Sequence, residues 1–137
     1  MAKKKILVID DEPDFLTLFK IRLEANNFSV VTASGGEEGL EKIKSDLPDA
    51  VFLDILMPEM DGLVVLKAIR EQYPALPVFM ITVFSAVDKF DQERFKVAKS
   101  LNATGFIFKT RDLDEEIKNM ITLLEGIKDG EKKDFIG

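Results

Sequence analysis

The 137-residue sequence contains no cysteine, no histidine and no apolar run long enough to cross a bilayer. The absence of cysteine excludes disulfide bonds and thiolate metal sites. The absence of histidine excludes imidazole metal ligands, histidine catalysis and a phosphohistidine on this chain. The basic start, Lys3–Lys5, precedes an apolar run that is too short for a signal-sequence core. Any catalytic chemistry must therefore come from carboxylates, hydroxyls and lysines.

The formal net charge is −6, which argues against a nucleic-acid-binding surface and leaves room for a cation or a basic partner. The length suits a single domain, and the apolar content of 46% is ordinary for a soluble globular protein. We therefore expect one domain in the cytoplasm, without a membrane span and without direct binding of nucleic acid.

Five short apolar runs alternate with segments whose apolar residues recur at helical spacing. The expected strands are Lys5–Ile9, Phe28–Ala33, Ala50–Leu53, Pro77–Ile81 and Gly105–Phe108. Runs that are apolar on both faces are typical of parallel strands, and right-handed crossovers place the helices on both faces of the sheet. The sequence predicts an α/β fold with a single doubly wound five-stranded parallel sheet and five flanking helices. The expected domain covers residues 1–127, and residues 128–137 are expected to form a flexible tail.

Local signals predict where the helices begin and which sides face inward. Segments with capping-box spacing, Ser34–Glu37 and Asp112–Glu115, predict the starts of the second and fifth helices. Gly39 is expected to weaken the second helix. The fourth helix is expected to be longer and more charged, and its expected inner residues are Val87, Phe90, Val97, Ala98 and Leu101.

Polar side chains stand just beyond four of the five strands. Asp10 and Asp11 follow the first strand, Asp54 the third, Thr82 the fourth and Lys109 the fifth. Each residue alone could have a local role, as a helix cap, a turn residue or a surface lysine. Because the carboxyl ends of parallel strands lie at one edge of a sheet, however, these side chains should converge. The joint pattern favours a reactive site.

Three neighbouring carboxylates cannot all stay ionised without compensation. Lys109 offsets one charge, and a divalent cation would offset two more. Since every available ligand is an oxygen, the pattern favours Mg²⁺. The first-choice ligands are the side chains of Asp11 and Asp54 and the backbone carbonyl of Leu56. Asp10 is expected to act directly or through a bound water.

The same arrangement suits phosphoryl transfer to a carboxylate. Asp54 is the expected nucleophile and phosphoacceptor. Lys109 would neutralise charge on the transferring group together with the metal, and Thr82 would donate a hydrogen bond to a phosphoryl oxygen. Because an acyl phosphate is labile in water, such a modification would be temporary.

Four segments together resemble a receiver (CheY-like) domain of the two-component response-regulator family. They are Ile6–Pro13, Leu53–Gly62, Ile81–Thr82 and Phe108–Lys109. The D-x-x-M-P-x-M-D-G run is the most specific of these, and the resemblance extends from Lys4 to about Ile127.

This resemblance implies the flavodoxin-like strand order 2-1-3-4-5. It also implies a sensor histidine kinase or a histidine phosphotransfer protein as phosphoryl donor. Phosphorylation would draw Thr82 towards the phosphoryl group and change the face formed by the fourth helix, fifth strand and fifth helix, where an unknown output protein or domain binds. Phe106 occupies the aromatic switch position of the family.

Three residues depart from the pattern of the family. Thr110 stands where proline is usual, so the usual cis peptide bond is not expected. Val83 stands where a small residue is more common and could narrow access to the site. Phe84 stands where the family tunes hydrolysis of the acyl phosphate, and we expect its bulk to obstruct an attacking water.

The chain between Thr82 and Lys109 is also long for the family. The two residues are 109 − 82 = 27 positions apart, which exceeds the usual separation by about one helical turn plus a residue. The extra length falls around residues 88–102. It predicts an unusual partner interface or dimer geometry, and a phosphorylation-dependent dimer is among the expected partners.

Other functions fit this sequence less well. A phosphatase of the haloacid dehalogenase type needs a second acid two residues after the nucleophile, where this chain has Leu56. A flavin-binding module is disfavoured because the acids of residues 10–12 would repel a phosphate. A pseudo-receiver, which acts as a phosphorylation-independent interaction domain, is the remaining alternative. We therefore expect no enzyme in the ordinary sense, and either a stand-alone regulator or a receiver from a longer chain.

Overall fold

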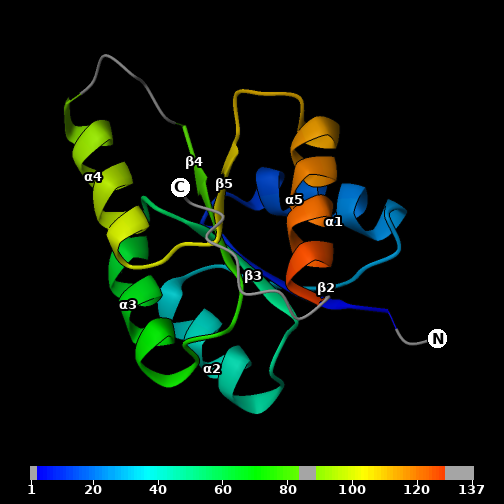
Figure 1. Ribbon diagram of the computed structural model, residues 1–137, viewed down its shortest axis with the longest axis horizontal. Coiled ribbons are helices and arrows are strands. Elements are labelled where there is room, and N and C mark those ends of the chain that lie inside the picture. Colours follow the sequence, from blue (N-terminus) through cyan, green and yellow to red (C-terminus); the bar gives the residue numbers. More distant parts are fainter. Residues whose placement is uncertain (1–2, 84–88, 129–137) are drawn as a thin grey trace.

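The computed structural model describes residues 3–83 and 89–128 (Figure 1). The strands in these ranges are β1 (Lys5–Ile9), β2 (Ser29–Ala33), β3 (Ala50–Asp54), β4 (Val78–Thr82) and β5 (Gly105–Phe108). The helices are α1 (Pro13–Ala25), α2 (Gly36–Ser45), α3 (Gly62–Gln72), α4 (Lys89–Ser100) and α5 (Leu113–Lys128). The observed strand ends differ from the predicted ones by at most one residue. Phe84 and residues 129–137 lie outside the described ranges.

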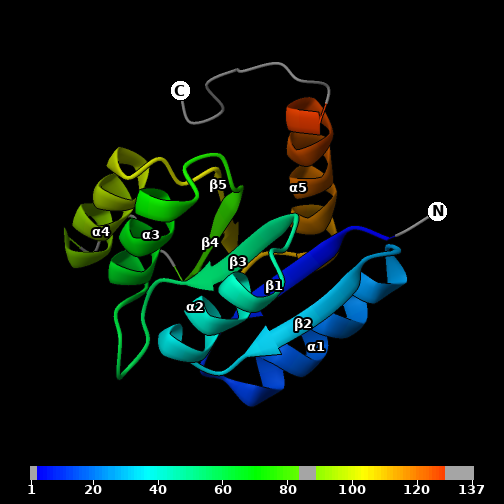
Figure 2. The same cartoon turned by 90° about the horizontal axis from the view of Figure 1, so that it is seen from below.

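The strands form one parallel sheet in the order β2-β1-β3-β4-β5. Helices α1 and α5 cover one face, and α2, α3 and α4 cover the other (Figures 1 and 2). The predicted doubly wound α/β fold is therefore confirmed. Since all strands run in the same direction, their carboxyl ends share one edge of the sheet.

Each face of the sheet has its own apolar core. In β1, Leu7 and Ile9 pack towards α2 and α3, whereas Ile6 and Val8 pack towards α1 and α5. The same alternation runs through β3 and β4, whose side chains are almost all buried. Burial on both faces is why these strands are apolar throughout and do not alternate with polar residues.

The start of α2 differs from the predicted capping box. Gly35 is the N-cap and makes no side-chain cap, and the Ser34 backbone N–H and hydroxyl donate to Glu38, not to Glu37. Gly39, expected only to weaken the helix, has a packing role: an added Cβ would lie 2.4 Å from the Ile9 side chain. This glycine lets α2 pack closely on the sheet.

The start of α5 agrees only in part with the prediction. The Asp112 carboxylate accepts a hydrogen bond from the Asp114 N–H at 3.0 Å, as an N-cap does. Glu115 is exposed, and the neighbouring Glu116 is buried and accepts from the Phe108 N–H at 2.8 Å. The second acid of the predicted box is therefore solvent-facing, and the next residue joins α5 to β5.

Some of the residues predicted to face inward from α4 do so, and others do not. Ala98 is fully buried and Leu101 packs against the core, but Val97 is 41% exposed. Val87 and the side chain of Phe90 lie outside the described part of the structure. Instead of Val97, Phe95 turns inward and stacks on Phe106, with 4.2 Å between ring centroids. No described helix is long and apolar enough to span a bilayer.

Candidate functional site

The carboxyl edge of the sheet brings together charged side chains from three strands. The Lys109 Nζ lies 2.9 Å from Asp10 Oδ2 and 3.9 Å from Asp54 Oδ2. One carboxylate oxygen from each of Asp10, Glu12 and Asp54 lies within 4.8 Å of the others. The topology therefore places residues that are far apart in sequence in a single acidic cluster with a lysine beside it.

Asp10 is the most deeply buried acid of the cluster. Its side chain has no exposed surface, and its Oδ1 accepts a hydrogen bond from the Glu12 N–H at 2.9 Å. Its Oδ2 lies at ion-pair distance from Lys109 but has no partner with hydrogen-bond geometry in the described structure. Burial raises the pKa of Asp10. A buried carboxylate oxygen with an incomplete set of partners is one that a cation could satisfy.

Asp54 ends β3 and is only 6% exposed. Its Oδ1 accepts from the Leu56 N–H at 3.2 Å. Burial, and then the charge of Asp10, raises the pKa of Asp54 to about 8, against the opposing charge of Lys109, and a hydrogen bond with Asp11 adds to the rise. In the absence of a cation, the folded protein therefore favours the protonated carboxyl at this position.

Lys109 is held by several groups at once. Its side chain is 11% exposed, its Nζ pairs with Glu12 as well as Asp10, and it lies 4.5 Å from the centroid of the Phe15 ring. Burial alone would lower the pKa of Lys109, but its pairing with the carboxylates of Glu12 and Asp10 raises it. The lysine is therefore a fixed positive charge at the centre of the site.

The other predicted site residues surround this cluster. Asp11 lines a neighbouring cleft of about 350 Å³ between the start of α2 and the loop after β3. Thr82, half-buried at the end of β4, lines a small recess together with Leu56. The Leu56 side chain is 54% exposed. Phe106 of β5 is not part of the acidic cluster, and its ring stacks on that of Phe95 of α4.

Glu12 was not among the predicted site residues. The run of three acids contained it, but the spacing could not tell which of the three side chains would reach Lys109. In the structure Glu12 pairs with Lys109 and lies close to Asp10 and Asp54, although its side chain is 60% exposed. The first-choice ligand Asp11 is half-buried, forms a hydrogen bond with Asp54 and also lines the adjacent cleft. Within residues 3–83 and 89–128 no peptide bond is cis, so the bond before Thr110 is trans, as expected.

A backbone hydrogen bond joins the two ends of the loop that follows Asp54. The Gly62 N–H donates to the Ile55 carbonyl at 2.8 Å, and a Cβ at Gly62 would lie 2.0 Å from the Asp54 carbonyl oxygen. Asp61 caps α3 by accepting from the Leu63 N–H at 2.8 Å. The Asp-Gly pair of the motif therefore allows α3 to begin directly against the end of β3.

Arg94 of α4 is a second contributor that the sequence did not reveal. Its guanidinium pairs with the Asp61 carboxylate and donates to the Ile55 carbonyl at 3.1 Å. Burial alone would raise the pKa of Asp61, but hydrogen bonds from Arg94 and from the Leu63 N–H lower it. No local sequence signal marks this arginine, since its partners are 33 and 39 positions away.

The donor set at this edge fits a hard divalent cation. The available ligands are carboxylate and carbonyl oxygens, and a buried oxygen of Asp10 lacks a hydrogen-bond partner among the described residues. A cation would also relieve the repulsion that raises the pKa of Asp54.

Comparison with known proteins identifies the family. The family model of the response regulator receiver domain matches residues 6–122. The alkaline phosphatase synthesis transcriptional regulatory protein PhoP of Bacillus subtilis (strain 168) is 35% identical over 121 residues, which are 86% of this chain and 48% of PhoP. The chain spans about half the length, or less, of the curated relatives that it matches.

Solved structures agree with this assignment. The receiver domain of NtrX from Brucella abortus is 34% identical, with a TM-score of 0.77 and coverage of 88% of this chain and 98% of that chain. A CheY-like response regulator receiver domain protein from Methanospirillum hungatei JF-1 has a TM-score of 0.85, with coverage of 95% and 100%, and at 23% identity supports the fold alone. From the family match and the shared fold, we conclude that this chain belongs to the response regulator receiver domain family of two-component systems.

Proposed function

We propose that Asp54 accepts a phosphoryl group from a sensor histidine kinase or a histidine phosphotransfer protein, in a reaction that depends on Mg²⁺. One observation carries the proposal: buried Asp10, nearly buried Asp54 and the Lys109 ammonium meet at the ends of three strands. In the reaction, an Asp54 carboxylate oxygen forms a bond to phosphorus while the bond from phosphorus to the donor's histidine nitrogen breaks. The donor's ring nitrogen keeps the electron pair of the broken bond, and the donor imidazole leaves as a neutral group because its ring carries a proton on the other nitrogen.

The chain's own residues prepare this reaction by controlling charge. Asp54 must be ionised to attack, although burial and Asp10 favour its protonated form. Lys109 supplies one compensating charge. The ligands that we propose for Mg²⁺ are Asp10, Asp11, Asp54 and the Leu56 carbonyl, with Glu12 close enough to contribute. When bound, the ion would neutralise the oxygens of the transferring group.

Thr82 and Phe106 are proposed to carry the response. A hydroxyl at the end of β4 can donate to a phosphoryl oxygen, and Phe106 packs on Phe95 of α4. Because Phe106 has no hydroxyl, any change in its position must act by packing. We propose that the surface of α4, β5 and α5 binds an output protein or domain and is the place where a phosphorylation-dependent dimer would form.

The curated relatives contain more residues than the region that matches this chain. PhoP and the transcriptional regulatory protein ZraR of Escherichia coli (strain K12) are longer than the matched region, which is 48% and 24% of their lengths. We propose that this domain is regulatory and not an enzyme in the ordinary sense, and that any contact with nucleic acid belongs to an output partner or domain. The retained set of acids and lysine speaks against the pseudo-receiver alternative. The cytoplasmic location stays a prediction.

Intact-mass spectrometry after exposure to a small-molecule phosphodonor tests the proposal. The wild-type protein should gain one phosphoryl group in the presence of Mg²⁺ and none with a chelator. Asp54→Asn should gain none, because an amide is a poor nucleophile. Asp14→Asn, which changes an exposed aspartate of α1, is the matched control and should behave as wild type. A wild-type protein that stays unmodified, or a phosphorylated Asp54→Asn variant, would refute the assignment.

A further inference from the structure

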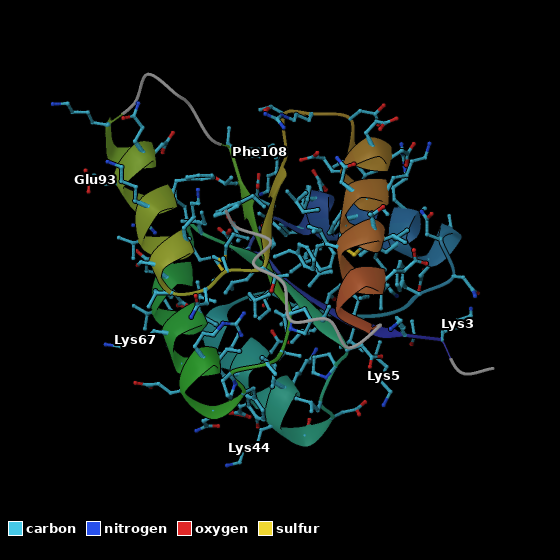
Figure 3. The ribbon with its side chains drawn as sticks, in the orientation of Figure 1. Lys3, Lys5, Lys44, Lys67, Glu93 and Phe108 are labelled. Carbon is cyan, nitrogen blue, oxygen red and sulfur yellow. The ribbon has the colours of Figure 1, made fainter. Side chains whose placement is uncertain are left out.

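Arg94 ties α4 to the loop that follows the phosphoacceptor strand. The arginine side chain is only 13% exposed, and one of its terminal nitrogens, Nη2, contacts both the Asp61 carboxylate and the Ile55 carbonyl. The preceding residue, Glu93, is exposed and lies on the outer side of α4 (Figure 3). Arg94 is thus directed inward, towards the site, although it belongs to a largely polar helix.

The Ile55 carbonyl and the Asp61 carboxylate, both of which Arg94 contacts, lie at the two ends of the 55–61 loop. Ile55 is the first residue after Asp54, and its carbonyl also accepts the Gly62 N–H. Asp61 is the last loop residue and caps α3. A single guanidinium therefore bridges both ends of the loop from outside, in addition to the internal hydrogen bond that closes it.

The middle of the loop has less support from side-chain packing. Ile55 and Met57 are buried, but Leu56 between them is 54% exposed. The Leu56 carbonyl, which we propose as a metal ligand, is one peptide unit away from the Ile55 carbonyl that Arg94 holds. Because consecutive peptide planes are linked by only two soft dihedral angles, fixing the first restricts the second. Arg94, Leu56 and Thr82 also line the same small recess.

We propose that Arg94 is a positioning residue for the cation site: it holds the 55–61 loop so that the Leu56 carbonyl is directed towards the acids. This inference rests on the proposed function. Residues that orient metal ligands without contacting the metal typically change its affinity by 10-fold or more when they are replaced. Since Phe95 packs on Phe106, the same turn of α4 contacts both the loop and β5, so a movement of the loop would be transmitted to α4.

Isothermal titration calorimetry with Mg²⁺ tests the inference. Arg94→Gln should weaken Mg²⁺ binding about tenfold, and hydrogen exchange at the amides of residues 55–62 should become faster. The phosphorylation rate at saturating Mg²⁺ should stay close to that of wild type, because the reacting groups are intact. Asp61→Asn, which removes the charge of the partner and keeps an acceptor for the cap, should weaken binding in the same direction without adding to the effect of Arg94→Gln.

Arg70→Gln provides the matched control. Arg70 also links α3 to the turn that follows α4, because it donates to the Asn102 carbonyl at 2.8 and 3.1 Å, but none of its hydrogen bonds in the described structure reaches the 55–61 loop. Its replacement should lower stability without changing the affinity for Mg²⁺. Unchanged affinity in Arg94→Gln, or an equal loss in Arg70→Gln, would overturn the inference. If wild type itself binds no Mg²⁺, the proposed function fails instead. In that case, unchanged hydrogen exchange at residues 55–62 in Arg94→Gln would separately refute the inference that Arg94 holds the loop.

Discussion

At the scale of single residues, the main feature is the cost of placing two acids together in a buried position. Asp10 has no exposed surface and Asp54 very little, and only Lys109 provides a nearby positive charge among the groups that shift the pKa of Asp54. Functional sites often contain buried acids that repel one another, because burial and like charges shift the pKa values on which reactivity depends. Without a cation, this part of the molecule should therefore lower the stability of the fold.

The raised pKa of Asp54 predicts how stability changes with pH in the metal-free protein. Its pKa rises from 3.8 to about 8 in the folded state, so between these values the folded protein binds the extra proton. The free energy of unfolding should therefore fall as the pH rises through this window, by at most about 1.4 kcal/mol per pH unit from this group. Urea denaturation of wild type and Asp54→Asn, with a chelator, would measure the slope.

The Asp54→Asn variant should lose this contribution, because its amide does not titrate. It should be more stable than wild type at about pH 8, with a difference that shrinks towards about pH 4. Added Mg²⁺ should stabilise wild type at the higher pH. Equal pH slopes in the two proteins would show that Asp54 does not titrate in this way.

At the scale of elements, a buried acid of α5 adds a hydrogen bond to the apolar packing between β5 and α5. Glu116 lies in the first turn of α5 and is 7% exposed, and its carboxylate accepts from the Phe108 N–H near the end of β5. Figure 3 labels Phe108 close to the carboxyl end of the sheet. Because Lys109 follows Phe108 directly, this hydrogen bond also helps to place the lysine of the site.

Replacement of Glu116 by alanine should therefore destabilise the protein. The partly buried Phe108 N–H would lose the Glu116 acceptor, and loss of a hydrogen bond to a charged group typically costs about 1–3 kcal/mol. Chemical denaturation should detect the loss. Glu115→Ala, at the exposed neighbouring position, is the control and should change stability by less than about 0.5 kcal/mol. A similar loss in both variants would mean that helix propensity, and not the hydrogen bond, accounts for the effect.

At the scale of the whole molecule, stability comes from two apolar layers, one on each face of the sheet. On the face covered by α1 and α5, three fully buried rings form a row: Phe52 lies between Phe19 and Phe79, with ring centroids 5.2 and 5.3 Å apart. Phe52 thus connects a helix with two adjacent strands, one of which ends in Asp54.

Phe52→Ala should be the most destabilising of the substitutions considered. Removal of a buried phenylalanine typically costs about 3–5 kcal/mol through lost burial and the cavity that remains. That is a large share of the total stability of a domain, which is about 5–15 kcal/mol. Leu18→Ala, at an apolar position that is 41% exposed, should cost far less. Denaturant midpoints of the two variants would measure these losses of stability. A small loss of stability in Phe52→Ala would contradict the packing argument.

The sequence was sufficient for much of the fold and for the main residues of the site. Apolar runs and helical spacing predicted all five strands and helices within the described structure, because strands buried on both faces must be apolar throughout. The strand order came from the resemblance to receiver domains, since short-range patterns do not specify which strands are neighbours. Polar residues at the strand ends predicted that Asp10, Asp54 and Lys109 would meet, because parallel strands share one edge.

Only the tertiary structure decided which side chains within a local run face inward. Phe95 and not Val97 packs inward from α4, Glu12 joins Asp10 and Asp54 through its contact with Lys109, and Arg94 reaches the loop after β3. These choices depend on backbone direction and on the rotation of a helix about its axis, which are set by contacts between segments distant in the chain. The sequence by itself thus determined the elements and the chemistry of the sheet edge, and tertiary packing determined the neighbours that hold that chemistry in place.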